Sequence, residues 1–479
     1  MKAIELKNVT FSYEGYESRV LSDICFSVEY GEVALLSGFS GEGKSTVLSL
    51  IAGIIPNITP GEFSGEVLIN GENIIGQKMT EICRKVGVVL QNAEAQIIQQ
   101  LVEDEIAFGC ENFAFSHSKI KECINRACSQ MQLEPQWRTR SLSGGQKQRL
   151  ITAATLATEQ NILVLDEPLA NLDKDGAELL MNTLRELAMS GYAVLVVEHR
   201  LDMVLPYVDT VWSINSGKIT KIENKREYLF TQSAYIQDTS VKIKTDNTAF
   251  RLDNVGFSVK GHQILKDVSF QIKKGERVLL LGENGCGKTT LMRLLARLLS
   301  PTRGSIVQGI DSRFGQRLRG TRKWFKQVGV VYQNPNYQLF MPTVQQEVAF
   351  GAQSEEYAQE IMQMFSITHL AQRHPQSLSE GQKRRVSIAA VAASNPAVLL
   401  LDEPTVGQDY AGLSEMVHIL NKIHSQTGNT MITITHDMRC AEALCDHTVC
   451  IDNGVVYEEG GKELAHRYFY PTYKLISSK

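Results

Sequence analysis

Two nine-residue stretches of the chain combine glycine, lysine and hydroxyl residues in a spacing that suits phosphate binding. Each fits the pattern G-x-x-x-x-G-K-[S/T], follows a short apolar run and precedes a segment of helical pattern. Glycines let backbone N–H groups point toward phosphate oxygens, and the helix that begins near the lysine adds the positive end of its dipole. An ordinary glycine turn is the alternative, but the second copy of the loop favours phosphate binding. The predicted binding residues are Gly38, Phe39, Ser40, Gly41, Glu42, Gly43, Lys44, Ser45 and Thr46, and Gly282, Glu283, Asn284, Gly285, Cys286, Gly287, Lys288, Thr289 and Thr290.

An acidic pair ends a buried strand in each half of the chain. Asp166-Glu167 and Asp402-Glu403 each follow an apolar run of strand length. A carboxylate at the carboxyl end of a central parallel strand lies where open α/β sheets bind ligands. We therefore predict that Asp166 helps to hold Mg²⁺, with the hydroxyl of Ser45 as a further ligand, and that Glu167 polarises the attacking water. The alternative for the aspartate is a helix cap, which Asp residues also form.

A third motif stands before another segment of helical pattern. On its own, a Ser-Gly-Gly sequence would be a flexible turn, but at the start of a helix it builds a second anion site from backbone N–H groups. A domain with two phosphate-directed sites and one phosphate loop needs a partner to complete a nucleotide site. The motif comprises Ser143, Gly144, Gly145 and Gln146 in the first half, and Ser379, Glu380, Gly381 and Gln382 in the second.

The motifs recur in the same order because the chain contains an internal duplication. We predict two domains, residues 1–225 and 249–479, and a linker over 226–248 that lacks strong periodicity. Short alternating strands come first in each copy, and buried parallel-type strands come later. The predicted fold class is α/β, with a doubly wound core, a helical subdomain and a small antiparallel sheet in each copy.

Composition narrows the class of protein. A chain of 479 residues exceeds what one core holds, and its net charge of −4 gives no support for a nucleic-acid-binding protein. The nine cysteines are scattered without a C-x-x-C pair, which indicates reduced cytosolic thiols rather than disulfides or a metal site. The N-terminus lacks the apolar core of a signal peptide, and no apolar run approaches the roughly 18 residues that cross a bilayer. We therefore expect other chains to supply any membrane span.

Taken together, these motifs resemble those of the ABC-type ATPases, and the resemblance extends over nearly the full chain. It implies two RecA-like P-loop ATPase domains that pack head to tail, with ATP and Mg²⁺ between one domain's phosphate loop and the other's SGGQ-type motif. Site one would combine Lys44, Gln91, Asp166, Glu167 and His199 with Ser379, Gly381 and Gln382. Site two would combine Lys288, Gln333, Asp402, Glu403 and His436 with Ser143, Gly145 and Gln146.

The resemblance also implies roles for single residues. Tyr13 would stack on the adenine ring, and the two histidines would contact the γ-phosphate. A buried core histidine is the alternative, although each histidine follows an apolar strand at a matching distance from the acidic pair. The implied catalytic residues are Glu167, Glu403, His199, His436, Gln91 and Gln333, and the implied metal ligands are Ser45, Gln91, Asp166, Thr289, Gln333 and Asp402.

Three departures distinguish the second copy from the first. Glu380 replaces the first glycine of the SGGQ motif and adds negative charge near the expected γ-phosphate. Val259 stands where the first copy has Tyr13, and an aromatic stacking contact is worth on the order of 1–3 kcal/mol. Residues 407–409 read Gly-Gln-Asp, whereas residues 171–173 read Asn-Leu-Asp. No departure removes a catalytic carboxylate, so we expect two competent but unequal ATP sites.

The segments that follow Gln91 and Gln333 resemble those of the ATPase components of energy-coupling-factor transporters, which import vitamins and transition-metal ions. Such a segment joins the glutamine to the helical subdomain, so it can convert nucleotide state into movement of a docked partner. Ordinary helical packing of its apolar residues is the alternative. The resemblance implies an ATP-hydrolysing translocase subunit at the cytoplasmic face of the cell membrane. Transmembrane subunits would dock on the helical subdomains, together with a substrate-binding membrane subunit.

Soluble tandem ABC ATPases that act on ribosomes or nucleic acid form the alternative class. Proteins of that class typically carry a long charged linker, metal-binding cysteines or a basic tail, whereas the predicted linker here is short and the net charge is acidic. The contrary feature is a basic stretch over residues 313–326, which could touch RNA or lipid headgroups, or could be a solvated face. We expect the transporter function and no nucleic-acid partner.

Overall fold

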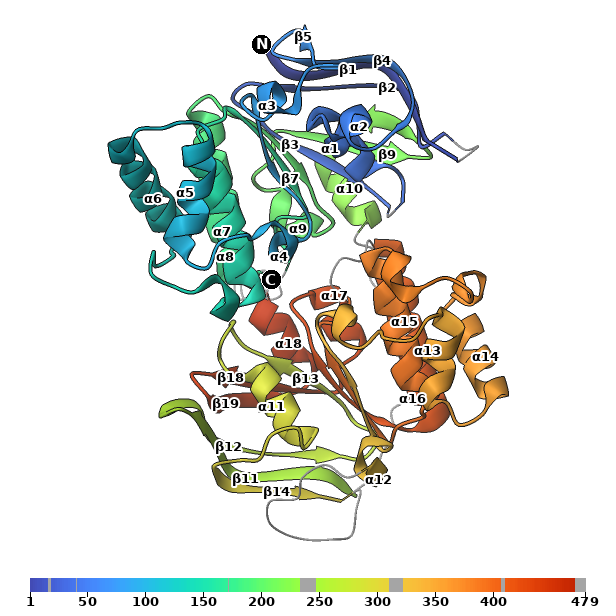
Figure 1. Ribbon diagram of the computed structural model, residues 1–479. Coiled ribbons are helices and arrows are strands. Elements are labelled where there is room, and N and C mark those ends of the chain that lie inside the picture. Colours follow the sequence, from blue (N-terminus) through green and yellow to red (C-terminus); the bar gives the residue numbers. More distant parts are fainter. Residues whose placement is uncertain are drawn as a thin grey trace, which may run out of the picture. The chain divides into compact units, whose positions relative to one another are not determined.

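The computed structural model describes residues 1–15, 19–39, 41–170, 172–232, 247–309, 322–405 and 410–469 (Figure 1). The chain divides into two compact units, Met1–Ala234 and Tyr235–Lys479. Across the described ranges, no helix is long and apolar enough to cross a membrane. Several residues named above lie outside the described residues, namely Ser40, Asn171, residues 407–409 and residues 313–321 of the basic stretch.

A parallel sheet forms the centre of the first unit. Its central strands are apolar and buried, because helices cover both faces of such a sheet. In the described part of this unit the strand order is β10-β9-β3-β8-β7-β6, and β10 alone in this sheet runs antiparallel to its neighbour. The strands are β3 (Val33–Gly38), β6 (Val86–Val89), β7 (Ile162–Asp166), β8 (Ala193–Val197), β9 (Thr210–Asn215) and β10 (Lys218–Lys221).

An antiparallel sheet and a group of helices complete the first unit (Figure 1). The sheet has the order β2-β1-β4-β5 and contains β1 (Lys2–Tyr13), β2 (Leu21–Glu29), β4 (Gly61–Ile69) and β5 (Glu72–Asn73). The helical subdomain contains α5 (Val102–Asn112), α6 (His117–Met131) and α7 (Gly144–Ala157), which pack against one another. The other helices are α1 (Lys44–Ile51), α2 (Ile54–Asn57), α3 (Met79–Ile82), α4 (Ala93–Gln96), α8 (Lys174–Met189), α9 (Leu201–Val204) and α10 (Lys225–Gln232).

The second unit repeats this architecture, but its described strands join in one sheet. Over its described residues, the strands form a single sheet of order β14-β11-β12-β19-β18-β13-β17-β16-β15, because Asp267 pairs with Val455 and joins β12 to β19. In the first unit the corresponding strands belong to two sheets. The strands are β11 (Thr248–Val259), β12 (His262–Lys273), β13 (Arg277–Leu281), β14 (Arg303–Gln308), β15 (Val328–Val331), β16 (Val398–Asp402), β17 (Thr430–Ile434), β18 (His447–Asp452) and β19 (Val455–Gly460).

The helices of the second unit follow the same plan. Its helical subdomain contains α13 (Val344–Gly351), α14 (Glu355–Met364) and α15 (Glu380–Ala393), and the others are α11 (Lys288–Leu295), α12 (Arg322–Phe325), α16 (Tyr410–Thr427), α17 (Met438–Ala443) and α18 (Lys462–Phe469). The predicted α/β fold class, with a core, a helical subdomain and an antiparallel sheet in each copy, is confirmed. The segment predicted as a linker, 226–248, begins inside α10, and its residues 233–246 lie outside the described residues.

In each unit the helix that begins at the SGGQ-type motif packs closely on the strand that leads to the glutamine. A Cβ atom on Gly87 of β6 would lie 2.8 Å from Cγ2 of Thr155 on α7. A Cβ atom on Gly329 of β15 would lie 2.4 Å from Cγ1 of Val391 on α15. Glycine therefore permits the close approach of helix and strand in both units.

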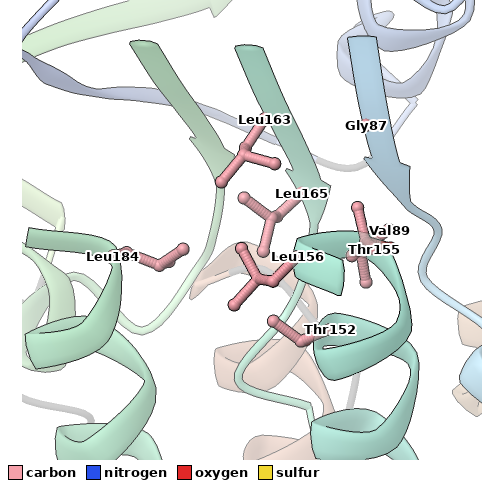
Figure 2. Close-up of a pocket in the computed structure, with 8 residues that line it drawn as sticks. All are labelled: Gly87, Val89, Thr152, Thr155, Leu156, Leu163, Leu165 and Leu184. Atoms are coloured by element: carbon pink, nitrogen blue, oxygen red, sulfur yellow. The ribbon is translucent and has the colours of Figure 1, made fainter. Parts of the chain in front are cut away.

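A small pocket lies beside this contact in the first unit (Figure 2). Apolar residues of β6, β7, α7 and α8 line it, together with Thr152 and Thr155. Both hydroxyls donate to carbonyls of their own helix, Thr152 to Gln148 O at 3.0 Å and Thr155 to Ile151 O at 2.9 Å. The pocket is therefore a gap in the packing of the core and has no polar group directed at a nucleotide.

Candidate functional site

The first phosphate loop joins the end of β3 to the start of α1. Gly38 has φ of 154°, and a Cβ atom there would lie 2.4 Å from Ile214 O, so the close approach to β9 requires glycine. The buried ammonium group of Lys44 donates to Gly38 O at 2.9 Å and to Phe39 O at 2.8 Å. The loop therefore curls around the lysine and holds a positive charge at the amino end of α1.

The second phosphate loop has the same geometry. Gly282 has φ of 150°, and a Cβ atom there would lie 2.2 Å from Ile451 O of β18. The ammonium group of Lys288 donates to Gly282 O at 2.6 Å and to Glu283 O at 2.8 Å. Both units thus present one buried lysine inside a glycine loop, which is an arrangement suited to a polyphosphate.

In the first unit, four predicted site residues converge beside the loop. The Ser45 hydroxyl donates to Oδ2 of Asp166 at 3.0 Å. On the neighbouring Glu167, Oε2 accepts a hydrogen bond from Gln91 Nε2 at 2.9 Å, and Oε1 lies 3.3 Å from His199 Nε2. Gln91, the Asp166–Glu167 pair and His199 are far apart in the sequence, and the parallel sheet brings them to one edge.

The two carboxyls of this pair differ in their electrostatic surroundings. Burial and the adjacent Glu167 raise the pKa of Asp166 to about 6, against the Ser45 hydroxyl and the charge of Lys44. Burial acts to raise the pKa of Glu167 as well, but the His199 and Gln91 hydrogen bonds and Lys44 together bring it below its usual value. Glu167 is therefore an anion at neutral pH, as a residue that accepts a proton from water must be.

The second unit places the corresponding residues together with different contacts. Thr289 Oγ1 donates to Asp402 Oδ2 at 3.1 Å, as Ser45 does in the first unit. Glu403 accepts a hydrogen bond from the backbone N–H of His436 at 3.3 Å, and His436 Nε2 lies 3.5 Å from the other oxygen, Oε1. Within the described residues, that buried Oε1 has no hydrogen-bond partner. Burial and Asp402 raise the pKa of Glu403 to about 8.

Both glutamates have the left-handed backbone conformation, with φ of 48° at Glu167 and 51° at Glu403. Residues other than glycine rarely adopt this conformation, and it costs about 1–3 kcal/mol. Both units therefore share this strained backbone conformation at the same position, the glutamate of the acidic pair. Gln333 follows Tyr332 at the end of β15, the place that Gln91 occupies after β6.

The SGGQ-type motifs begin α7 and α15. Ser143 Oγ accepts from Gln146 N at 3.2 Å, and Gln146 Oε1 accepts from Ser143 N at 2.9 Å. Ser379 and Gln382 make the same reciprocal pair at 3.3 and 3.1 Å. These side chains form a capping box, a signal that the S-x-x-Q spacing already contains and that the sequence analysis did not use.

Glu380, the departure in the second motif, is paired within its own helix. Its Oε1 accepts from Lys383 Nζ at 3.1 Å. The corresponding Lys147 of the first unit instead donates to Glu94 of α4 at 2.6 Å. The extra negative charge of Glu380 is therefore partly neutralised one turn further along α15.

The two units differ in their contacts at the positions of Tyr13 and Val259. The Tyr13 hydroxyl lies 2.9 Å from Thr46 Oγ1, in hydrogen-bond contact with α1, which positions the ring beside the phosphate loop. Val259 ends β11 and is 46% exposed. Adenine stacking on Tyr13 stays a prediction.

Two residues that the sequence analysis missed hold the segment after the first acidic pair. Glu198 accepts from Leu169 N at 3.0 Å and from His199 N at 2.8 Å, which ties the strand end of β8 to that segment. Arg200 donates to Leu169 O at 2.7 Å and to Leu172 O at 3.2 Å. Their acidic and basic side chains beside His199 were visible in the sequence, but no spacing rule connected them to Leu169 and Leu172.

The donor set beside each loop fits Mg²⁺. This ion prefers oxygen ligands and binds through one or two carboxylates together with phosphates. Ser45 with Asp166, and Thr289 with Asp402, supply a hydroxyl and a carboxylate that already contact each other. A divalent cation would also offset the repulsion from Glu167 that, together with burial, raises the pKa of Asp166.

Each unit therefore combines a glycine loop around a lysine, a hydroxyl–carboxylate pair and a positioned glutamate on a parallel α/β core. That combination defines a P-loop nucleoside triphosphatase with a duplicated domain. The family model described as ABC transporter matches residues 21–170 and 265–406. The chain belongs to the ABC transporter family, and the prediction of an ATPase with two fused ATP-binding domains is confirmed.

Individual relatives span almost the whole chain. One relative is the Bacillus subtilis (strain 168) protein YkoD, whose name describes an HMP/thiamine import ATP-binding protein. It is 32% identical over 96% of this chain and 92% of its own length. A Treponema denticola protein whose name refers to ABC transporter ATP-binding is 32% identical over 95% of this chain and 96% of its own length. A solved structure described as ribosome-bound archaeal Pelota and ABCE1 has a TM-score of 0.72 at 20% identity, over 96% of this chain and 80% of that chain. The last likeness shows the shared fold alone.

Proposed function

We propose that this chain is the ATP-hydrolysing subunit of a membrane importer of the energy-coupling-factor type, which serves a vitamin or a metal ion. Support comes from the 32% identity with YkoD, whose name refers to HMP/thiamine import, because the alignment spans nearly the full length of both chains. The chain would act at the cytoplasmic face of the cell membrane. It would bind transmembrane subunits and, through them, a substrate-binding membrane subunit.

The observation that carries the proposal is an exposed apolar surface on the segment after Gln333. Phe340 and Phe350 are 66% and 67% exposed, and their rings meet edge to face with centroids 5.4 Å apart. The buried carboxylate of Glu347 accepts the backbone N–H groups of Phe340 at 2.8 Å and Met341 at 2.7 Å. Exposed aromatic side chains on a backbone held in this way favour a protein partner.

The first unit holds its corresponding segment by the same device. Glu105 is buried and accepts the backbone N–H groups of Ile98 at 2.8 Å and Gln99 at 2.7 Å. Ile98 is 67% exposed and Phe108 is 37% exposed, so this surface is less aromatic than that of the second unit. Two transmembrane contacts of different shape, one for each unit, would explain why both surfaces are held rigidly and yet differ.

The nucleotide chemistry follows from the residues of each unit. We propose that ATP binds between the phosphate loop of one unit and the SGGQ-type motif of the other. Lys44 and Lys288 would neutralise charge on the β- and γ-phosphates, as positioning and charge stabilisation dominate phosphoryl transfer. Glu167 would accept the proton of the attacking water, held in place by Gln91 and His199.

Mg²⁺ would be held by Ser45 and Asp166 in one site and by Thr289 and Asp402 in the other, where it supplies charge neutralisation at the phosphates. Gln91 and Gln333 complete the proposed metal surroundings. Since each glutamine also begins the segment with the exposed apolar surface, a shift of the glutamine on hydrolysis would move the docked partner. ATP binding would draw the two units together and hydrolysis would release them.

Co-purification with membrane proteins tests this proposal. The full chain, purified from detergent-solubilised membranes of its own cell, should retain transmembrane subunits. Phe340→Asp should lose them while ATP turnover of the isolated chain stays within about twofold, because Phe340 is exposed and outside the ATP site. Met189→Asp, which charges another exposed apolar residue at the end of α8, is the matched control and should retain them.

The alternative function is that of a soluble factor on ribosomes or nucleic acid. The likeness to the structure of ribosome-bound archaeal Pelota and ABCE1 favours that class in fold only, at 20% identity. Recovery of ribosomal subunits or RNA with the wild-type chain, and of no transmembrane protein, would overturn the importer proposal.

A further inference from the structure

Arg384 is a buried cation on the helix that begins with the second SGGQ-type motif. The residue is 5% exposed, and its Nη1 donates to the backbone carbonyl of Tyr332 at 3.0 Å. Tyr332 directly precedes Gln333 and follows the last residue of β15. The guanidinium group therefore joins α15 to the point at which the Gln333 segment leaves the sheet.

A second side chain holds the other main-chain group of Tyr332. The backbone N–H of Tyr332 donates to Gln338 Oε1 at 2.9 Å, and Gln338 Nε2 donates to Val330 O at 2.6 Å. The residue before Gln333 is thus fixed on both sides, by Gln338 from the segment itself and by Arg384 from the neighbouring helix. Loss of the Arg384 hydrogen bond would free a carbonyl at the base of the segment.

The positive charge of Arg384 also interacts with nearby carboxylates, including those of the acidic pair. Burial lowers its pKa to about 10, and the carboxylates of Glu403, Glu380 and Asp402 act in the opposite direction. It is therefore a cation at neutral pH. Within the described residues its Nε is buried without a hydrogen-bond partner. A buried charge with an unsatisfied donor is costly for stability.

The first unit has no such cation at the corresponding position. Gln148 stands there, 1% exposed and neutral. In that unit the helix is tied to the segment after the glutamine by the Lys147–Glu94 ion pair, whose Glu94 side chain is 55% exposed. In the second unit Lys383 pairs with Glu380 instead, and the buried Arg384 contact makes the connection.

We propose that Arg384 is a positioning residue for ATP hydrolysis in the second unit. Its hydrogen bond to Tyr332 O holds the start of the Gln333 segment against α15. This inference rests on the proposed role of Gln333 in the ATP site. The first unit makes the corresponding connection through a solvent-screened ion pair, so the two units differ in how firmly the glutamine is held.

Three variants of the full chain test the inference. Arg384→Gln introduces the residue that the first unit accommodates, Arg384→Lys keeps the charge, and Arg385→Gln is the matched control. Arg385 is the next residue of the same helix and pairs with Glu415 at 2.7 Å, away from the Gln333 segment. Two properties are measured: amide hydrogen exchange of residues 328–340, and kcat and KM for ATP in a Glu167→Gln background, in which the second site supplies the remaining turnover.

We expect Arg384→Gln to accelerate exchange in residues 328–340 by about tenfold, because one charge-assisted hydrogen bond is lost. In the Glu167→Gln background, where the second site supplies the remaining turnover, it should lower kcat about tenfold with KM changed less than about twofold, since the loss falls on the chemical step. Arg384→Lys should recover at least half of both effects. Arg385→Gln should match the wild type in both measurements.

Equal behaviour of Arg384→Gln and Arg385→Gln would overturn the inference. So would faster exchange over the whole of residues 322–405, because that result assigns Arg384 to general stability. If Arg384→Gln does not fold, Arg384→Lys alone decides between faster exchange confined to residues 328–340 and none. Absence of ATP hydrolysis in the wild type would reject the proposed function, whereas normal hydrolysis with no effect at Arg384 would reject only this inference.

Discussion

The side-chain amide of Gln91 donates to the Glu167 carboxylate across 2.9 Å, although 76 positions separate the two residues in the chain. With His199 at the other oxygen, Glu167 has a side-chain contact at each end of its carboxylate. Glu403, its counterpart, accepts a hydrogen bond from the backbone N–H of His436, and its Oε1 lies 3.5 Å from His436 Nε2 without a hydrogen-bond partner within the described residues. Aligned glutamates in the two halves therefore occupy different surroundings.

We expect Glu167→Gln to remove more ATP turnover than Glu403→Gln. Loss of a general base slows its site by about 10²–10⁴-fold, and the better-positioned Glu167 should carry most of the turnover. Glu403→Gln should therefore retain more than half of the wild-type rate, and Glu167→Gln well under half. Phosphate release at saturating ATP measures both. Equal losses would show that the two sites contribute equally.

Arg277→Met should destabilise the second unit strongly. Arg277 is fully buried, pairs with Asp446 at 2.7 Å and donates to Asn421 Oδ1 at 3.0 Å. Removal of one member of a buried pair leaves the other charge uncompensated, at a cost of about 3–5 kcal/mol. The matched control is Arg185→Met in the first unit, whose exposed pair with Asp209 is worth about 0–1 kcal/mol. Urea unfolding measures both, and similar shifts in the two variants would contradict the prediction.

Gly329→Ala should destabilise the chain through the contact between α15 and β15. The new Cβ would lie 2.4 Å from Val391 Cγ1 and 3.0 Å from Pro396 Cγ, so helix and strand must separate. Overpacking of this kind costs about 1–3 kcal/mol. Gly351→Ala is the control, because its new Cβ would meet its nearest atom at 3.7 Å. Thermal unfolding should show a lower midpoint for the first variant only.

Stability of the second unit should depend on pH through His447. Its Nδ1 lies 3.4 Å from Glu276 Oε1 and its Nε2 lies 3.3 Å from Glu459 Oε2. Burial alone would lower the pKa of His447, but the contacts with Glu276 and Glu459 outweigh it and raise that pKa. Since the folded pKa lies above the unfolded value of about 6.5, the stabilisation is complete below pH of about 6.5 and declines as pH rises through the folded pKa. His447→Gln should remove this decline when unfolding free energy is followed from pH 5 to 8.

Much of the architecture was predictable because its signals are local. The strand–glycine loop–helix order around Lys44 and Lys288, the acidic pairs and the internal duplication each depend on short stretches of residues. The loops, the α/β core and the helical subdomains lie where those patterns predicted. The capping boxes at Ser143 and Ser379 were equally local, and the S-x-x-Q spacing would have found them.

Contacts between distant segments were beyond such patterns. No spacing rule connects Arg384 to Tyr332, 52 residues earlier, or Glu347 to the backbone of Phe340 as an anchor for an exposed side chain. The pairing of Glu380 with Lys383 is a nearby exception: opposite charges three residues apart on a helix could have been matched from the sequence.

The sequence by itself determined that the chain carries two copies of a phosphate-binding ATPase domain, because glycine loops and their lysines act through local backbone geometry. Only the tertiary structure decided that the two copies treat the same glutamate differently. Burial, the hydrogen bond from Gln91 to Glu167 and the charge of Arg384 on α15 near Glu403 set the surroundings of the two glutamates. These contacts depend on how segments far apart in the chain pack together.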